Sequence, residues 1–243
     1  MQDLAGKTYW LVGASEGLGR ALAQQLDAAG ARLVLSARTK ARLQDLAQTL
    51  QHPATVLPVD IANDTSVQTA GAQLPPIDGV ILNAGVYSPM VASNWRNGMA
   101  VAMANVNLTG VLRVLDQVMP RFVARDAGHI VIVGSLAGFR GLPGAIGYGA
   151  SKAGVMSLAE SLYADLRHTG VRVQLANPGF IKTRLTDQND FTMPFLMTPE
   201  YAACQILNLM QSRRFKHNFP RVFSWAFRAS QFMPDWMYYR LFA

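Results

Sequence analysis

The chain has 243 residues, of which 50% are hydrophobic and 15% are charged, so it can bury a large core and is not a disordered chain. Its single cysteine, Cys204, excludes an internal disulfide framework and a cysteine-clustered metal site, and we predict no metal. The net charge of +7 is concentrated in residues 213–243, which hold six lysines and arginines, so no basic body for binding nucleic acid is indicated.

Short apolar runs alternate along the chain with amphipathic stretches. The apolar runs predict strands at residues 8–12, 32–36, 55–58, 79–82, 129–133 and 171–176. The amphipathic stretches predict helices at residues 18–29, 40–50, 65–73, 95–125 and 148–168. Because nearly continuous apolar strands are separated by helices, we expect an α/β fold, a doubly wound parallel sheet of the Rossmann type with helices on both faces.

We expect a single domain whose catalytic body spans residues 1–212 and whose basic, aromatic-rich helical tail spans residues 213–243. No run reaches the roughly 18 uninterrupted apolar residues that a membrane span requires. The N-terminus also lacks a basic region followed by a long apolar one, so no signal peptide is predicted. These features predict a cytoplasmic protein, either soluble or peripheral at a membrane surface.

The turn after the first predicted strand is rich in glycine and reads Val12-Gly13-Ala14-Ser15-Glu16-Gly17-Leu18-Gly19. Glycines there permit a tight turn and a close approach of backbone N–H groups to a pyrophosphate at the helix N-terminus. The same letters spell Gly-x-Ser-x-Gly, the nucleophile elbow of α/β-hydrolases. Only one strand precedes Ser15 and none of the four histidines has an obvious partner, so we reject the hydrolase interpretation.

The end of the second predicted strand bears on the choice of cofactor. An acidic residue there would bind the ribose 2′-hydroxyl of NAD, but the sequence Ser36-Ala37-Arg38-Thr39-Lys40 has no carboxylate. Arg38 is suited to bind a 2′-phosphate with its guanidinium group. The alternative is that Arg38 and Lys40 form the solvated first turn of a helix, where cations are slightly unfavourable. We predict NADP rather than NAD.

Tyr148 and Lys152 are four residues apart on a predicted helix and therefore share one face. An ammonium group beside a phenol favours the phenolate and is expected to lower the pKa of the tyrosine, which then exchanges a proton nearer neutral pH. Ser135 follows the predicted strand 129–133, at the edge of the sheet where open α/β folds bind ligands.

With these motifs in order, the chain resembles the short-chain dehydrogenase/reductase superfamily from about Leu4 to Leu209. The resemblance rests on the glycine turn and on the motifs Asp60-Ile61, Asn83-Ala84-Gly85, Val106-Asn107-Leu108, Gly134-Ser135-Leu136-Ala137-Gly138, Tyr148-Gly149-Ala150-Ser151-Lys152 and Pro178-Gly179-Phe180-Ile181-Lys182-Thr183.

The resemblance implies an NADP(H)-dependent oxidoreductase that reduces a carbonyl or oxidises the alcohol, with Asn107, Ser135, Tyr148 and Lys152 as catalytic residues. Tyr148 would be the general acid or base, Lys152 would bind the nicotinamide ribose, Ser135 would bind the substrate oxygen, and Asn107 would hold a water behind Lys152. The implied cofactor-binding residues are Gly13, Ser15, Gly17, Leu18, Gly19, Arg38, Asp60, Ile61, Asn83, Ala84, Gly85, Tyr148, Lys152, Pro178, Gly179, Ile181 and Thr183.

Three positions depart from the family pattern. Val12 stands where the family usually has threonine, and Leu82 where it often has a first asparagine, so two structural hydrogen bonds near the adenosine are lost. Glu16 stands where NADP-dependent members often have lysine or arginine, and a carboxylate there would repel a 2′-phosphate. Arg38 is then the main support for NADP.

The expected partner is a small-molecule substrate, and we expect a homo-oligomer, a dimer or tetramer. The side chains expected over the nicotinamide are apolar, which indicates a lipophilic substrate if they line the pocket and a buried stripe if they do not. They are Phe139, Leu142, Phe180, Leu185, Phe191, Met193, Phe195, Leu196 and Met197.

The tail holds ten of the 22 aromatic residues. Its apolar helical face consists of Val222, Trp225, Ala226, Ala229, Phe232 and Met233, with Arg221 and Arg228 beside it. Such a face can lie in a membrane interface, or pack over the substrate cleft or against a second subunit, and packing is the interpretation we favour. A non-catalytic nucleotide-binding scaffold, possibly at a membrane surface, is the alternative function, although a pure binder has no use for Tyr148.

Overall fold

The computed structural model describes residues 3–242, and its centre is a sheet of seven parallel strands in the order β3-β2-β1-β4-β5-β6-β7. The strands are β1 (Thr8–Val12), β2 (Arg32–Ser36), β3 (Thr55–Val56), β4 (Gly79–Leu82), β5 (Gly128–Val133), β6 (Val171–Pro178) and β7 (Lys216–Phe219). This order confirms the predicted doubly wound sheet. Because the order reverses between β1 and β4, a crevice is expected at the carboxyl ends of these strands.

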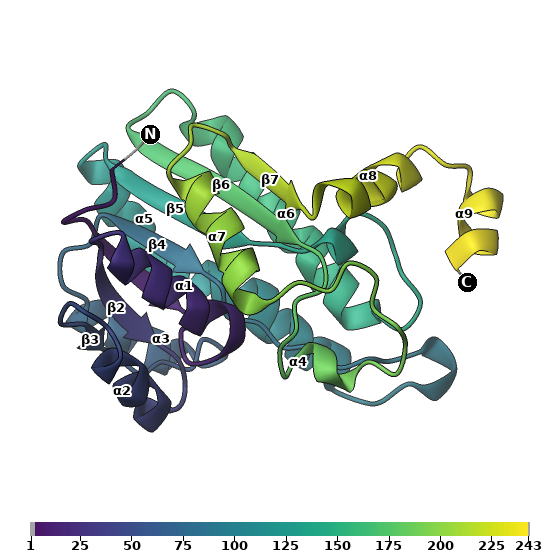
Figure 1. Cartoon of the computed structure of the whole chain (residues 1–243), viewed down its shortest axis with the longest axis horizontal. Coiled ribbons are helices and arrows are strands. Elements are labelled where there is room, and N and C mark those ends of the chain that lie inside the picture. The colour runs from purple at the N-terminus through teal and green to yellow at the C-terminus, as the bar shows by residue number, and fades with distance from the viewer. Residues whose placement is uncertain (1–2, 243) are drawn as a thin grey trace.

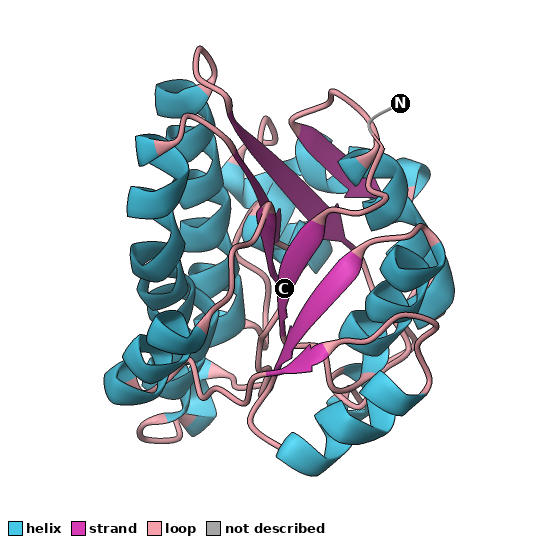
Figure 2. Cartoon of the chain, turned by 90° about the vertical axis from the view of Figure 1, so that its left-hand side faces the viewer, coloured by secondary structure: helices cyan, strands magenta, loops and turns pink. Residues whose placement is uncertain are grey.

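Helices cover both faces of the sheet (Figures 1 and 2). They are α1 (Gly17–Ala28), α2 (Lys40–Gln48), α3 (Asp64–Gln73), α4 (Met99–Ala104), α5 (Gly110–Ala124), α6 (Ile146–Leu166), α7 (Pro199–Met210), α8 (Arg221–Ser230) and α9 (Asp235–Phe242).

The strand β1 shows how its residues divide between two cores. Leu11 belongs to the apolar cluster that includes Leu22 of α1 and Ile206 of α7. The neighbouring Trp10 belongs to the cluster on the other face, with Val114 of α5 among its members. Alternate side chains of a strand point to opposite faces, so a nearly continuous apolar run supplies both cores.

The single helix predicted at residues 95–125 is interrupted in the structure. Gly98 has a left-handed backbone (φ 79°) and precedes α4, and a π-helical segment, Asn105–Thr109, separates α4 from α5. A π-helical turn accommodates one extra residue and is common at functional sites, and this one contains Asn107.

Two elements were not predicted from the sequence. The helix α7 begins at Thr198-Pro199, where the Thr198 side chain accepts a hydrogen bond from the N–H of Tyr201. The strand β7 forms the start of the segment predicted as a helical tail, and it pairs with β6 from Lys216 to Phe219. Because β7 is an edge strand with partly exposed polar residues, it lacks the apolar run by which the other strands were recognised.

The described helices, those within residues 3–242, include none that is both long enough and apolar enough to cross a bilayer.

A buried polar network joins side chains of the strands β1, β5 and β6. The amide nitrogen of Gln174 donates to backbone carbonyls, so its oxygen accepts from Nε2 of His129 at 2.9 Å. The hydroxyl of Tyr9 then donates to Nδ1 of His129 at 2.8 Å. Burial, helped by the positive charge of Arg172, lowers the pKa of His129 to about 3, so the folded protein keeps this imidazole neutral.

The network predicts a loss of stability in acid. From about pH 6.5 down to about pH 3 the unfolded chain protonates this histidine and the folded chain does not, so the free energy of unfolding falls by up to about 1.4 kcal/mol per pH unit. His129→Gln is expected to make the fall of the urea midpoint shallower in this window. Parallel slopes for the wild type and the variant would contradict the assignment.

Candidate active site

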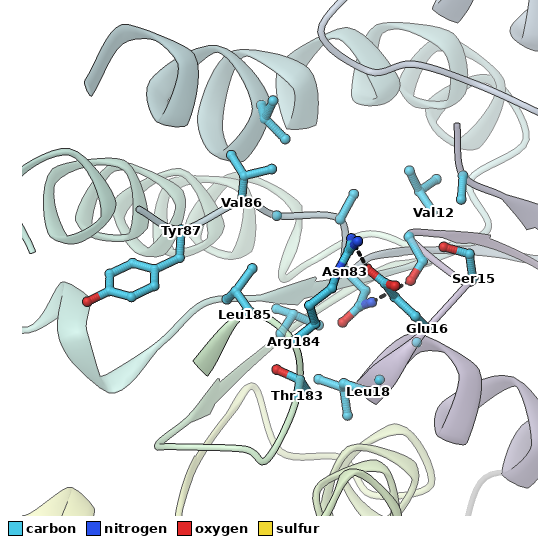
Figure 3. Close-up of a pocket in the computed structure, with 18 of the residues that line it drawn as sticks. Val12, Ser15, Glu16, Leu18, Asn83, Val86, Tyr87, Thr183, Arg184 and Leu185 are labelled. Atoms are coloured by element: carbon cyan, nitrogen blue, oxygen red, sulfur yellow. Dashed lines mark hydrogen bonds and ion pairs between the residues drawn. The ribbon is translucent and has the colours of Figure 1, made fainter. Parts of the chain in front are cut away.

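A cleft of about 650 Å³ lies at the carboxyl ends of the strands where their order reverses (Figure 3). The structure brings to this cleft every residue expected at the cofactor, and Ser135 as well. They are Gly13, Ser15, Gly17, Leu18, Gly19, Arg38, Asp60, Ile61, Asn83, Ala84, Gly85, Ser135, Tyr148, Lys152, Pro178, Gly179, Ile181 and Thr183.

The turn between β1 and α1 is held by backbone contacts that only glycine allows. Gly13 has a left-handed backbone (φ 92°), and its N–H donates to the carbonyl of Ser36 at 2.7 Å. A Cβ on Gly19 would lie 1.9 Å from the carbonyl oxygen of Gly13. The first turn of α1 therefore lies directly against the end of β1.

The N-terminus of α1 opens into the cleft through Gly17, Leu18 and Gly19. Glu16 is the N-cap residue, but its side chain makes no capping hydrogen bond, so no side chain occupies the first N–H groups of the helix. Free N–H groups at the positive end of a helix dipole form an anion site. This cradle fits the pyrophosphate of a dinucleotide.

The segment after β4 is fastened to the same turn. The side-chain amide of Asn83 donates to the carbonyl of Gly13 at 2.7 Å, and the N–H of Ala84 donates to the carbonyl of Val12 at 2.9 Å. Asp60 lies across the cleft, where its carboxylate accepts from the N–H of Ala62 at 3.0 Å. Asn83 thus acts first as a structural link, with its amide nitrogen already bonded.

The mouth of the cleft beside the glycine turn is charged. One carboxylate oxygen of Glu16 pairs with Arg42 at 2.8 Å, and the other pairs with Arg184 at 2.5 Å (Figure 3 labels Glu16 and Arg184). Arg38, four residues before Arg42 in the sequence, also lines the cleft. The repulsive charge expected from Glu16 is therefore balanced by two guanidinium groups that the sequence pattern did not reveal.

Ser135, Tyr148 and Lys152 meet at the inner part of the cleft, where β5 ends and α6 begins. Lys152 is buried, its Nζ donates to the carbonyl of Val133 at 2.8 Å, and it lies 5.9 Å from the centre of the Tyr148 ring. Burial lowers the pKa of Lys152 to about 8, so it is still mostly charged at neutral pH.

The pKa of Tyr148 moves in the direction opposite to the one expected. Burial raises this pKa above its usual value, the hydroxyl of Ser135 lowers it, and the neighbouring Tyr87 raises it, with burial the largest effect. The prediction of a lowered pKa for Tyr148 is therefore wrong for the protein by itself, in which the net shift is upward. The physical reason is that burial removes water from the phenolate, and this cost outweighs the hydrogen bond from Ser135, while the ammonium group of Lys152 donates to Val133.

Asn107 does not line the cleft. Its side chain is fully buried and holds Val86, accepting from the N–H at 2.7 Å and donating to the carbonyl at 2.9 Å. It also donates to the hydroxyl of Ser151, next to Lys152, at 3.0 Å. Asn107 thus connects the segment after β4 to α6 and fixes the wall behind Lys152.

Tyr87 is a site residue that the sequence pattern did not reveal. Its ring, labelled in Figure 3, contacts the Tyr148 ring edge-to-face, with 5.1 Å between the centroids. Its hydroxyl donates to Asn189 at 3.0 Å. Its position two residues after Gly85 was the available signal. Tyr87 joins the reactive phenol to the loop that follows β6.

That loop lies over the glycine turn. Pro178 ends β6, and the N–H of Gly179 donates to the carbonyl of Phe219 in β7 at 2.8 Å. A Cβ on Gly17 would lie 2.9 Å from the methyl group of Thr183, so α1 and the loop are in close contact. The unpredicted strand β7 therefore helps to position the cofactor side of the cleft.

Of the apolar side chains expected over the nicotinamide, Leu185 lines the cleft. Met197 is buried in the core, whereas Phe191, Phe195 and Leu196 are exposed. Val86 and Tyr87 line the cleft near Leu185 (Figure 3), and the ring of Tyr87 contacts that of Tyr148.

Comparison with known proteins agrees with this geometry. A family model described as short chain dehydrogenase matches residues 7–193. An uncharacterised oxidoreductase of Myxococcus xanthus is 40% identical over 204 residues, 81% of each chain. A 3-oxoacyl-(acyl-carrier-protein) reductase of Rickettsia prowazekii is 29% identical over 77% of this chain and 78% of the relative. A solved short-chain dehydrogenase from Sphingobium yanoikuyae, in complex with NADPH, is 27% identical with a TM-score of 0.84 and covers 92% of this chain and 91% of its own.

The glycine turn leads to a prediction about packing. Gly19→Ala places a methyl group against backbone that cannot move aside, so we expect the free energy of unfolding to fall by about 1–3 kcal/mol. Urea denaturation measures the effect. Gly141→Ala is the matched control, because nothing lies within 4 Å of its Cβ position. Equal unfolding free energies for the two variants would contradict the close contact.

Proposed function

The chain belongs to the short-chain dehydrogenase family and is an NAD(P)-dependent oxidoreductase, and on this premise we propose that it reduces a carbonyl group with NADPH, or oxidises the alcohol, using Tyr148 as general acid or base. The observation that carries the proposal is the meeting of Ser135, Tyr148 and Lys152 in a cleft that opens onto the glycine turn. A scaffold without turnover is not favoured, because it requires the glycine turn but not this group of side chains.

The dinucleotide, when bound, supplies the hydride that reduces the carbonyl carbon. The N-terminus of α1 would hold its pyrophosphate, Asp60 and Ile61 would border the adenine, and Lys152 would bind the nicotinamide ribose. Val86, fixed by Asn107, forms the neighbouring wall.

Tyr148 donates its phenolic proton to the substrate oxygen while Ser135 donates a hydrogen bond to the same oxygen. The phenol is protonated at neutral pH and is therefore in the form that can donate a proton in carbonyl reduction, although burial raises its pKa and makes it a weaker acid in the protein by itself. The charged Lys152 then stabilises the phenolate that remains. Burial thus strengthens each electrostatic interaction within the site.

NADP is the cofactor that we propose within the NAD(P) class. Arg38 and Arg42 both line the mouth of the cleft, and no carboxylate follows β2 where an NAD-binding site has one. The carboxylate of Glu16 is held by Arg42 and Arg184, so its charge is already balanced. A 2′-phosphate at this mouth would compete with Glu16 for Arg42.

The substrate that we propose is a small lipophilic carbonyl compound. Support comes from Val86, Tyr87 and Leu185 beside the reactive phenol, and from the relative that is named for reducing an acyl carbonyl. We further propose a homo-oligomer, because Val101 of α4 and Leu112 of α5 are exposed on neighbouring helices.

Removal of the phenolic hydroxyl tests the assigned acid. Tyr148→Phe is expected to lower NADPH oxidation with an accepted ketone by at least about 100-fold, since general acid catalysis contributes that much or more. NADPH affinity should change little, because the ring and the glycine turn remain. Tyr163→Phe, farther along α6, is the matched control. Turnover that survives in Tyr148→Phe would show that another group donates the proton.

The cofactor choice is tested by the arginines at the mouth. Arg38→Ala and Arg42→Ala are each expected to weaken NADPH binding by about tenfold or more, the value of a hydrogen bond to a charged group, and to leave NADH binding nearly unchanged. Thermal shift and calorimetry measure both cofactors. Arg32→Ala, at the opposite end of β2, is the control. Equal losses for NADPH and NADH would argue against contact with a 2′-phosphate.

A further inference from the structure

The helices α8 and α9 present an apolar surface outward. They extend beyond the body of the molecule at the right of Figure 1. The buried positions of α8 are Ser224 and Ser230, whereas Val222 and Trp225 are 73% and 67% exposed. Phe232, just after α8, is 89% exposed. The side that faces the protein is thus partly polar, and the apolar face predicted from the sequence is left without a partner among the described residues.

The helix α9 also carries exposed apolar side chains. Trp236, Tyr239, Leu241 and Phe242 are all exposed, and Tyr238 is the residue of this helix that is buried. We call the exposed side chains of residues 222, 225, 232, 236, 239, 241 and 242 the tail face. An exposed apolar surface of this kind in a soluble fold marks an interaction site.

Contacts on the opposite side hold the two helices in this orientation. Arg140 donates to the carbonyls of Ser230 and Met233, pairs with Asp235, and lies 4.0 Å from the centre of the Tyr238 ring. The hydroxyl of Tyr238 donates to the carbonyl of Gly141 at 2.7 Å. Rotation of the helices to bury the tail face would break these bonds, so the exposure is a property of the folded chain.

The charges around the tail face are positive. Arg221, Arg228 and Arg240 are exposed, and none of them forms an ion pair with another residue in the range 3–242. Asp235, the one acidic residue after Glu200, is paired with Arg140. Arg221 lines a shallow hollow together with Val222 and Trp225, so cation and apolar side chains are side by side.

The combination of exposed apolar side chains and exposed arginines favours one of two partners for the tail face, a second copy of the chain or a lipid surface. A second copy docked on the same face would bring two surfaces that both carry positive charge against each other, and like charges across an interface are unfavourable. An anionic lipid surface offers phosphate groups to the arginines and a headgroup layer in which tryptophan and tyrosine rings are stable. We propose that the tail face docks on the surface of an anionic bilayer, with α8 and α9 lying in its interface.

Docking of the tail face on a bilayer would also bring the cleft near the lipid. This consequence rests on the function proposed above. Phe180 follows Gly179 of the cleft lining, and its ring is 5.9 Å from that of Phe223 in α8. Phe223 in turn is 5.0 Å from Phe227. These aromatic contacts place α8 beside the loop that lines the cleft, so a bilayer bound to the tail face would lie near the cleft.

Vesicle binding tests the proposal with the full chain and without any turnover, so its failure is distinct from failure of the proposed function. We expect the protein to sediment with phosphatidylcholine vesicles that contain about one-third phosphatidylglycerol, and far less with phosphatidylcholine alone. The double variant Trp225→Ser, Trp236→Ser should lose about tenfold or more of the binding to anionic vesicles. Trp95→Ser, which removes another exposed tryptophan, is the control and should bind as the wild type does.

A second variant separates charge from apolar contact. Arg221→Gln with Arg228→Gln keeps every aromatic ring and is expected to reduce binding to anionic vesicles by about 30-fold, since each of the two basic residues contributes about 1 kcal/mol near such a surface. Thermal melting checks that both double variants fold. Absence of binding by the wild type, or equal loss in Trp95→Ser, would overturn the proposal. So would a fall in the light-scattering mass of the tryptophan variant without any lipid binding, because the face would then be a subunit contact.

Discussion

The close contact between the first turn of α1 and the end of β1 is the constraint on which the cleft depends. Gly19 lies so near the carbonyl of Gly13 that no side chain fits between them. The same carbonyl accepts the amide of Asn83, so the segment after β4 is fixed to the turn. Three stretches of chain thereby meet at the switch point of the sheet, and the uncapped N–H groups of α1 face the space that they enclose.

The reactive side chains are placed by burial as much as by spacing. Lys152 is held against the carbonyl of Val133, and Asn107 holds Val86 from within a π-helical turn. In this environment the pKa of Tyr148 rises, because the cost of desolvating a phenolate outweighs the hydrogen bond from Ser135. The protein by itself therefore holds the Tyr148 proton more tightly than a solvent-exposed tyrosine does.

The segment after α7 has two structural roles that the sequence pattern did not distinguish. Its first residues, Lys216–Phe219, complete the sheet and support Gly179 at the cleft. Its last two helices are fastened through Arg140 and leave their aromatic face outward. The helical spacing located the exposed apolar face of α8, and the helix contacts Phe180 of the loop after β6 through Phe223, which is not part of that face. Packing of the face against a second subunit stays a prediction.

The sequence by itself determined the parallel sheet and the place of the glycine turn, because strand periodicity and glycine spacing are local properties that survive without knowledge of contacts. It also placed Tyr148 and Lys152 on one helical face. Only the tertiary structure decided that Arg42 and Arg184 balance Glu16, that Tyr87 packs on Tyr148, and that Asn107 stands behind the cleft. These relations join residues far apart in the chain, and electrostatic balance and burial depend on which groups the fold brings within a few ångströms of one another.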